Sequence, residues 1–142
     1  MPAGESTGYG ASSTAEGVRR IAVLAAGYAD GYFRSLSFPS LPDLRAQGGM
    51  VALAGRIVPV AGRVSMDLIV ADITSLPEGA VSRGDMAELI GPAVPLDEVA
   101  RRAGALGYEV LTSLGERYRR HYTRGGRIPS GGAGNNKGRS VS

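Results

Sequence analysis

Tyr28 and Asp30 are the residues of this chain best placed to do chemistry, because they lie between two glycines directly after an apolar run. Residues 20–26 are short, apolar and partly β-branched, which predicts a mostly buried strand. Gly27 and Gly31 permit backbone conformations closed to other residues, and Asp30-Gly31 is a turn signal. A tyrosine held on such a turn suits a reacting group. The alternative is a half-buried tyrosine that covers the core beside an ordinary turn.

Two further stretches contain residues that could contribute to a functional site, 60–67 (VAGRVSMD) and 107–112 (GYEVLT). Each also has a plain structural interpretation. An arginine on a strand, such as Arg63, is usually a solvated charge, and Met66 lies in an alternating pattern typical of core. Tyr108 can pack on residues one helical turn further along.

Taken in order, residues 27–36 (GYADGYFRSL), 60–67 and 107–112 resemble three motifs of the carboxy-terminal domain of bacterial alanine racemase. The likeness runs from about Pro2 to about Tyr122. The fold implied is mostly β, a small antiparallel β barrel or sandwich with one or two short helices. The activity implied is the interconversion of L-alanine and D-alanine, which supplies D-alanine for peptidoglycan.

The resemblance also implies a role for each candidate residue. Tyr28 matches one of two acid/base groups that exchange the Cα proton on opposite faces of the substrate. The other group is a lysine on a separate amino-terminal barrel domain of a partner subunit in a homodimer, and it holds pyridoxal phosphate. The Met66 backbone N–H matches a contact to the substrate carboxylate, and Tyr108 a contact to the cofactor phosphate. Arg63 and Asp67 line or brace the mouth of the site.

The chain departs from the family in two respects. Ala105-Leu106 stand where the family commonly has Thr-Ile, and no tyrosine lies between Tyr32 and Tyr108 to act as a gate. The single lysine, Lys137, lies in a glycine-rich stretch that offers no rigid pocket. We therefore expect the chain to be inactive alone, as a truncated gene, an excised domain or part of a split enzyme. The alternative is a non-catalytic β-barrel module that binds a ligand or partner.

Composition is typical of one soluble domain, with 43% hydrophobic and 20% charged residues over 142 positions. No segment has the length of a membrane span or the pattern of a signal peptide, so we expect a cytoplasmic protein without a membrane partner. The absence of cysteine excludes disulfides and thiol catalysis. The net charge of +3 comes largely from the late segment 117–124 and the tail, so we expect no nucleic-acid partner. His121 lacks companions for a metal site.

Hydrophobic periodicity predicts the elements that must position these residues. A domain is expected over residues 1–124 and a disordered tail over 125–142. Loops are expected at 3–11 and 37–43, although the resemblance implies an extended strand for the first. A hairpin is expected at 51–60 with its turn at Ala54-Gly55-Arg56. Further strands are expected at 63–66, 68–73, 86–90 and 118–122, and helices at 96–103 and 108–114.

Overall fold

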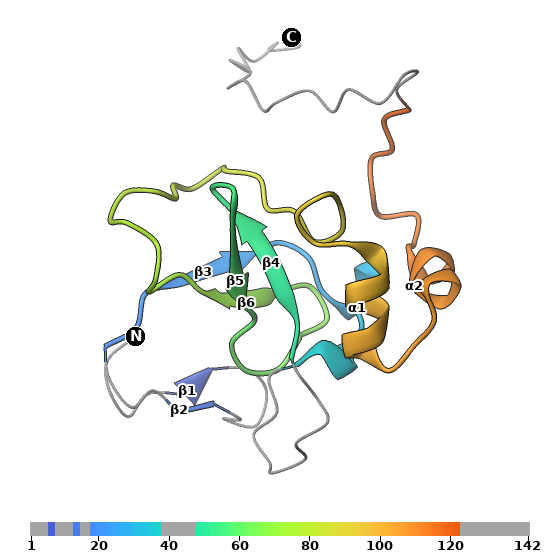
Figure 1. Cartoon of the computed structure of the whole chain (residues 1–142), viewed down its shortest axis with the longest axis horizontal. Coiled ribbons are helices and arrows are strands. Elements are labelled where there is room, and N and C mark those ends of the chain that lie inside the picture. The colour runs from blue at the N-terminus through green and yellow to red at the C-terminus, as the bar shows by residue number, and fades with distance from the viewer. Residues whose placement is uncertain (1–5, 8–12, 15–17, 38–47, 123–142) are drawn as a thin grey trace, which may run out of the picture.

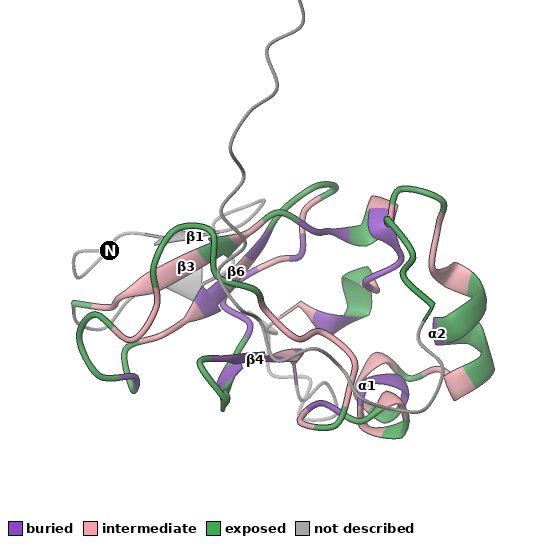
Figure 2. Cartoon of the chain, turned by 90° about the horizontal axis from the view of Figure 1, so that it is seen from above, coloured by how far each residue is buried: buried purple, intermediate pink, exposed green. Residues whose placement is uncertain are grey.

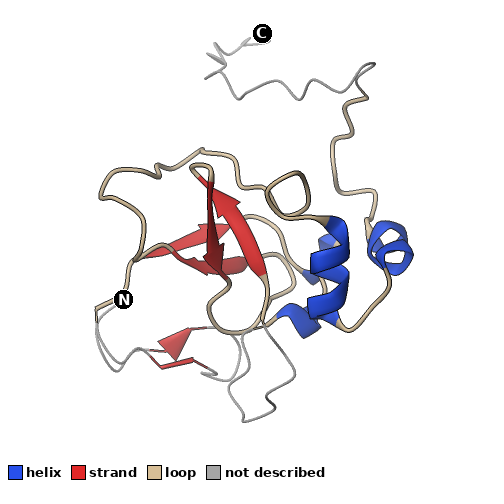
Figure 3. Cartoon of the chain, viewed as in Figure 1, coloured by secondary structure: helices blue, strands red, loops and turns tan. Residues whose placement is uncertain are grey.

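The computed structural model describes residues 6–7, 13–14, 18–37 and 48–122, in which long loops join short antiparallel strand pairs, two short 3₁₀ turns and two α-helices. The pairs are β1 (Ser6–Thr7) with β2 (Ser13–Thr14), β3 (Ile21–Leu24) with β6 (Ile69–Asp72), and β4 (Met50–Leu53) with β5 (Arg56–Pro59). The helices α1 (Leu96–Ala103) and α2 (Gly107–Ser113) contact each other beside the strands, as Figure 1 and Figure 3 show. The mostly β class with short helices is confirmed, and the described strand pairs do not close into a barrel.

The β4–β5 hairpin depends on two residues with a left-handed backbone. Ala54 and Gly55 have φ of +49° and +72°. Positive φ at both positions is what a two-residue type I′ turn needs, and its twist matches that of the flanking strands. Val51 and Val58 lie opposite each other in the ladder and are both buried, so the hairpin turns this face toward the core. The predicted hairpin is confirmed.

The β3–β6 ladder determines which residues meet at the end of β3. Leu24 pairs with Ile69 in an antiparallel register. Continued beyond both strand ends, that register places Tyr28 opposite Ser65. The Tyr28 N–H does donate to the Ser65 carbonyl, at 3.0 Å. The chain after β3 and the chain before β6 are therefore held together, although about forty residues separate them in sequence.

Branched aliphatic side chains form the core under this junction. Its most deeply buried members come from the strands, the loops beside them and the helices: Leu36, Val51, Leu53, Val58, Val60, Val64, Ile69, Val94, Val99 and Val110. Figure 2 shows buried segments on β4, β6 and α1. Burying one such side chain contributes about 1.5–3 kcal/mol, so these contacts give the junction a rigid base.

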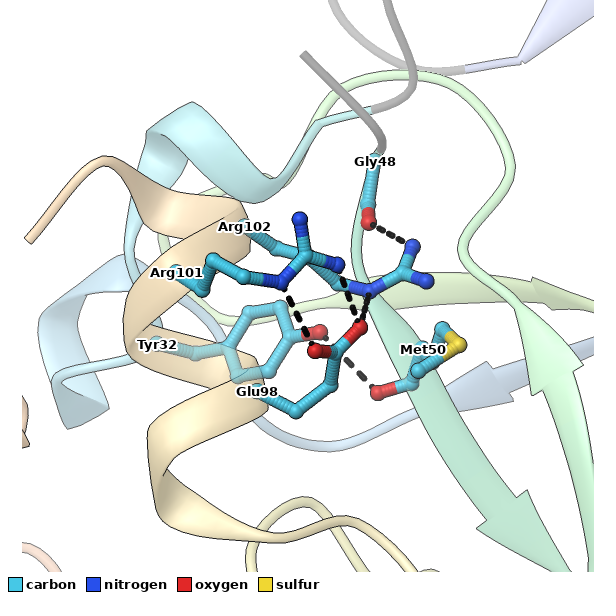
Figure 4. A network of polar contacts seen from close by, with 6 residues as sticks. All are labelled: Tyr32, Gly48, Met50, Glu98, Arg101 and Arg102. Carbon is cyan, nitrogen blue, oxygen red and sulfur yellow. Dashed lines mark hydrogen bonds and ion pairs between the residues drawn. The ribbon is translucent and has the colours of Figure 1, made fainter. Parts of the chain in front are cut away.

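A polar network joins α1 to the chain just before β4 (Figure 4). Glu98 accepts hydrogen bonds from Arg102 Nε at 2.6 Å and from Arg101 Nη2 at 2.7 Å. Arg102 Nη1 donates in turn to the Gly48 carbonyl at 3.1 Å. The hydrogen bonds from the two arginines lower the pKa of Glu98 to about 2. The helix predicted over residues 96–103 is thus confirmed and is tied to the sheet by charged groups.

Three stretches predicted as strands, 63–66, 86–90 and 118–122, form none. The carbonyls of Ser65 and Met66 accept N–H groups of the Tyr28 turn instead of those of a flanking strand. In the second stretch only Glu88 pairs, through a bridge to Ala52, and its carboxylate turns the chain by accepting two N–H groups further on. The third stretch pairs with no described strand.

Several expectations fall wholly or partly on residues that the structure does not describe. The loop predicted at 37–43 lies outside them apart from residue 37, and the tail predicted at 125–142 lies outside them entirely. In the opening segment, residues 6 and 7 form β1 and pair with 13 and 14. The rest of the stretch 3–11 lies outside the described residues, so the choice between a loop and the extended strand implied by the resemblance stays open. Neither α1 nor α2 has the length or the apolar character needed to span a membrane, and no other described helix does.

Candidate active site

Tyr28 begins a tight 3₁₀ turn, Tyr28–Asp30, a few residues after β3. Its side chain is 43% exposed. Below it, the buried Asp30 carboxylate accepts the Gly27 N–H through Oδ2 at 2.8 Å. The Gly31 N–H returns to the Tyr28 carbonyl at 3.1 Å, and Gly31 adopts φ of +96°, which glycine tolerates best. The turn predicted from Gly27, Asp30 and Gly31 therefore presents a phenol on a backbone fixed from both sides.

Two backbone segments approach this turn too closely to leave room for side chains. A Cβ on Gly27 would overlap with the carbonyl oxygens of Ser65 and Met66. A Cβ on Gly31 would overlap with the carbonyl oxygen of Ser113, at the end of α2. The two glycines are thus needed because the loop before β6 and the end of α2 both pack directly against the turn.

Tyr32, the second tyrosine of the motif, has a different environment. It is buried, and its hydroxyl donates to the Met50 carbonyl at 3.3 Å. Burial raises the pKa of Tyr32 well above its ordinary value, while the charge of Arg102 opposes that shift. Tyr32 is therefore a structural phenol that stays protonated, and Tyr28 is the tyrosine of this turn that can meet a substrate.

The structure brings Met66 to Tyr28. The Ala29 N–H donates to the Met66 carbonyl at 3.1 Å, beside the bond from Tyr28 to Ser65. The Met66 side chain is 47% exposed, so this residue is not part of the core. Its own N–H donates to no other described residue. A backbone N–H with no partner among the described residues therefore lies on the segment that binds the Tyr28 turn.

Asp67 and Arg63 lie on the same loop but differ in their contacts. Asp67 is exposed, and its Oδ1 accepts a hydrogen bond from Arg117 Nη2 at 2.7 Å. Arg117 Nε also lies 3.3 Å from Oδ1 of Asp30. The hydrogen bond to Asp67 and the charge of Asp30 raise the pKa of Arg117. Arg63 is half-buried and makes no hydrogen bond or ion pair with another described residue.

Arg117 is a residue of this site that sequence reasoning missed. It lies in the basic segment 117–124, directly before the stretch predicted as a strand, and sequence reasoning attributes its charge only to that segment. Its partners, Asp30 and Asp67, lie 87 and 50 positions earlier in the sequence. No local spacing signals such a contact. Only the packing of α2 against the Tyr28 turn brings Arg117 to the two carboxylates.

Tyr108 is the second residue of α2 and is 82% exposed. The helix begins with a capping interaction in which Glu109 accepts the Leu106 N–H at 2.6 Å. At the other end, Ser113 Oγ donates to the Gly31 carbonyl at 3.0 Å. Five residues of helix, about 7.5 Å of rise, separate Tyr108 from that contact. No hydrogen bond or ion pair among the described residues joins Tyr108 to the Tyr28 turn.

The site is therefore a rigid protein surface that offers a phenol, a backbone N–H and an outlying second phenol. In the described part of the chain, no three His, Asp or Glu side chains gather where they could hold a metal ion. Such a surface can transfer a proton and bind a carboxylate. It supplies no amine, because no lysine occurs among the described residues.

These features define a small β-rich domain that presents a tyrosine from the end of a strand, and comparison with known proteins places it in a family. A sequence model of the family described as alanine racemase, C-terminal domain, matches residues 1–122. The chain belongs to this family.

Individual relatives are similar over most of this chain but over only part of their own length. The biosynthetic alanine racemase of Agrobacterium fabrum is 48% identical over 121 residues, which are 84% of this chain and 31% of the relative. The catabolic alanine racemase of the same organism is 46% identical over 130 residues, 92% of this chain and 31% of the relative. The chain thus spans about a third of the length of these relatives.

Solved structures agree with this placement. The biosynthetic alanine racemase of Pseudomonas aeruginosa superposes with a TM-score of 0.73 at 42% identity, over 87% of this chain and 31% of that one. The alanine racemase of Bartonella henselae, solved with covalently bound pyridoxal phosphate, has a TM-score of 0.76 at 38% identity, over 87% and 32% of the two chains. The recognition of the family from three sequence motifs is therefore confirmed.

Proposed function

We propose that this chain is the carboxy-terminal domain of a pyridoxal-phosphate-dependent alanine racemase, an isomerase that interconverts L-alanine and D-alanine. The observation that carries the proposal is the junction of Tyr28 and Met66. An exposed phenol is held by backbone hydrogen bonds against a segment whose Met66 N–H has no partner among the described residues. The family membership and the cofactor in the Bartonella henselae relative support it.

Tyr28 would be one of the two acid/base groups. Racemisation removes a proton from one face of Cα and returns one to the other face, so two groups on opposite sides of the substrate suffice. The cofactor, when bound, acts as the electron sink that makes removal of this proton accessible. The Tyr28 hydroxyl would serve one face, and a lysine on a separate barrel domain of a partner subunit would serve the other.

Met66 would bind the substrate through its backbone rather than its side chain. Its N–H, which has no partner in the described part of the chain, is a suitable donor for the carboxylate of alanine, because charge-assisted hydrogen bonds are stronger than neutral ones. The adjoining residues Arg63 and Asp67 would line or brace the mouth of the site. Arg63 would carry its charge there, since no described acidic group pairs with it.

Among the described residues, one side chain is suited to bind pyridoxal phosphate, at its phosphate group. The exposed Tyr108 phenol has no partner in the described part of the chain and could donate to the phosphate. The covalent attachment would come from the lysine of the other domain, in a homodimer. We infer that the chain alone is inactive, and that the complete enzyme acts in the cytoplasm and supplies D-alanine for peptidoglycan.

The test is Tyr28→Phe in an enzyme assembled with a lysine-bearing barrel domain. The substitution keeps the aromatic ring and its packing but removes the hydroxyl that carries the proton. Turnover should therefore fall by about a hundred- to ten-thousand-fold, while the melting temperature should not change. Deuterium exchange at Cα should persist on the face served by lysine and nearly vanish on the other. Tyr122→Phe is the matched control, because Tyr122 is exposed and contacts no described residue through its hydroxyl. Wild-type turnover with equal exchange on both faces would favour a non-catalytic binding module instead.

A further inference from the structure

Arg117 joins the two segments that carry the candidate site. Its Nη2 donates to Oδ1 of Asp67 at 2.7 Å, and its Nε lies 3.3 Å from Oδ1 of Asp30. Asp30 belongs to the Tyr28 turn, and Asp67 directly follows Met66. One guanidinium group therefore bridges the Tyr28 turn and the Met66–Asp67 segment.

Asp30 makes this link stiff on one side. Its side chain is mostly buried, and its two carboxylate oxygens have separate partners. Oδ2 accepts the Gly27 N–H within the turn, and Oδ1 faces Arg117. A buried carboxylate needs such partners, because burying an unpaired charge is costly. A displacement of Arg117 would therefore be felt by the turn itself.

The backbone that carries Arg117 is also fixed. It directly follows α2, whose last residue, Ser113, donates to the Gly31 carbonyl at 3.0 Å. Within the segment itself, Arg120 Nη2 donates to the carbonyls of Leu114 and Gly115 at 3.3 and 3.1 Å, which closes the backbone around Arg117 into a local turn. Arg117 thus extends from a segment anchored at the end of α2 toward two carboxylates on two other segments.

We propose that Arg117 is a positioning residue, whose planar guanidinium sets the spacing between the Tyr28 turn and the Met66–Asp67 segment. It thereby aligns the Tyr28 phenol with the Met66 N–H. The inference rests on the function proposed above for these two groups. A guanidinium suits the task, because its donors lie in one rigid fork, whereas a lysine ammonium is a single point charge.

The expected effect is on geometry rather than on overall stability. Arg117 is half exposed and Asp67 nearly so, and ion pairs at such surfaces contribute little to folding. A displacement of about 1 Å in a catalytic group, by contrast, can lower turnover by about a hundredfold. If Arg117 served mainly to stabilise the fold, its substitution would instead lower the overall stability of the domain.

The first test measures amide hydrogen exchange in the 142-residue chain. Arg117→Gln should speed exchange of the Tyr28 and Ala29 N–H groups by about tenfold or more, because these amides close the junction. Amides of β4 and β6 should be unaffected. Arg117→Lys should behave like Arg117→Gln, since it keeps the charge but not the fork. Arg119→Gln is the matched control, because Arg119 is exposed and its side chain makes no hydrogen bond or ion pair with a described residue.

Several outcomes of this test would overturn the proposal. Unchanged exchange at Tyr28 and Ala29 in Arg117→Gln would show that Arg117 does not hold the junction. Loss of protection throughout β4 and β6 would make Arg117 a residue of general stability. Wild-type protection in Arg117→Lys would show that charge alone is sufficient.

The second test measures racemisation in the enzyme assembled with the lysine domain. Arg117→Gln alone should lower kcat by about a hundredfold. In a Tyr28→Phe background, Arg117→Gln should lower kcat further by no more than about threefold. The effects of two substitutions are not additive when one residue acts through the other. Multiplicative effects would contradict the positioning role. If Tyr28→Phe alone leaves turnover unchanged, the proposed function fails, while the exchange experiment still decides whether Arg117 holds the junction.

Discussion

At the scale of single residues, the absence of a side chain at Gly27 allows two backbone segments to meet. The carbonyl oxygens of Ser65 and Met66 occupy the space where a Cβ would lie. Backbone cannot move aside as a flexible side chain can, and these same carbonyls accept the Tyr28 and Ala29 N–H groups. The position of the Tyr28 phenol therefore depends on a glycine whose backbone is otherwise extended and accessible to any residue.

Gly27→Ala should lower the free energy of unfolding by about 3 kcal/mol or more, at the upper end of overpacking costs. Gly79→Ala is the control, because Gly79 has φ of +75° but open space around it. That change should cost only the left-handed backbone strain of about 1–2 kcal/mol. Urea denaturation of both variants measures the difference. Equal costs would mean that the approach of Ser65 and Met66 is not tight.

The sequence permits prediction of some residues of this site but not of others. Tyr28, Asp30 and Gly31 are readable because their signal is local, a strand followed by turn residues. The contact to Met66 becomes visible only when the β3–β6 register is known. Arg117 gives no local signal at all, since its two carboxylates come from distant segments. Contacts between loops follow from tertiary packing, which single-sequence periodicity does not describe.

At the scale of elements, α1 depends on charge as well as on its apolar face. Val99 and Ala100 are buried, while Glu98 pairs with the two arginines that follow in the helix. Because the pKa of Glu98 is lowered from 4.5 to about 2, the folded state favours the ionised carboxylate. This contribution is full above about pH 4.5 and is lost as the pH falls toward about 2.

Glu98→Gln should therefore lower the melting temperature near neutral pH, and the gap from the wild type should close in acid. It should narrow below about pH 4.5 and vanish only below about pH 2, where the wild-type carboxyl is neutral in the folded state too. Melting curves at a series of pH values measure the gap. Glu78→Gln is the control, because Glu78 is exposed and has no described partner. A gap independent of pH would show that the charge of Glu98 does not stabilise α1.

The sequence predicts best those helices and strands whose own residues show a clear hydrophobic periodicity or turn signal. The β4–β5 hairpin, β6, α1 and α2 follow from local patterns, and so does the existence of β3. The prediction that the β3 strand is mostly buried is wrong, because Val23 is 58% exposed and the other β3 residues are only half-buried. The stretch 86–90 has a strand pattern, yet the Glu88 carboxylate accepts the Ala93 and Val94 N–H groups at 2.6 and 3.0 Å and bends the chain. A charged side chain that caps a later loop cannot be recognised from alternation alone.

At the scale of the whole molecule, the proposed function requires two domains, because a second domain must supply the lysine. This chain presents Tyr28 and the Met66 N–H from one rigid junction and Tyr108 from the exposed end of α2. Exposed reactive groups of this kind need a second surface that excludes water and supplies the remaining chemistry. The chain spans about a third of its curated relatives, which is consistent with a site shared between domains.

The polypeptide of these 142 residues should therefore show no racemase activity and no stoichiometric visible absorbance after incubation with pyridoxal phosphate. Lys137 is its only lysine, and no described side chain supplies an amine beside Tyr28. Borohydride reduction followed by mass spectrometry should find only nonspecific labelling of the wild type by the cofactor, at its α-amino group and at Lys137. In Lys137→Ala, the labelling at position 137 should be absent. Adding a barrel domain with its lysine should restore both absorbance and turnover, and Tyr28→Phe should keep the absorbance while losing the turnover. Racemisation by the pure chain would show that a group within it replaces the lysine, and the two-domain site would then be wrong.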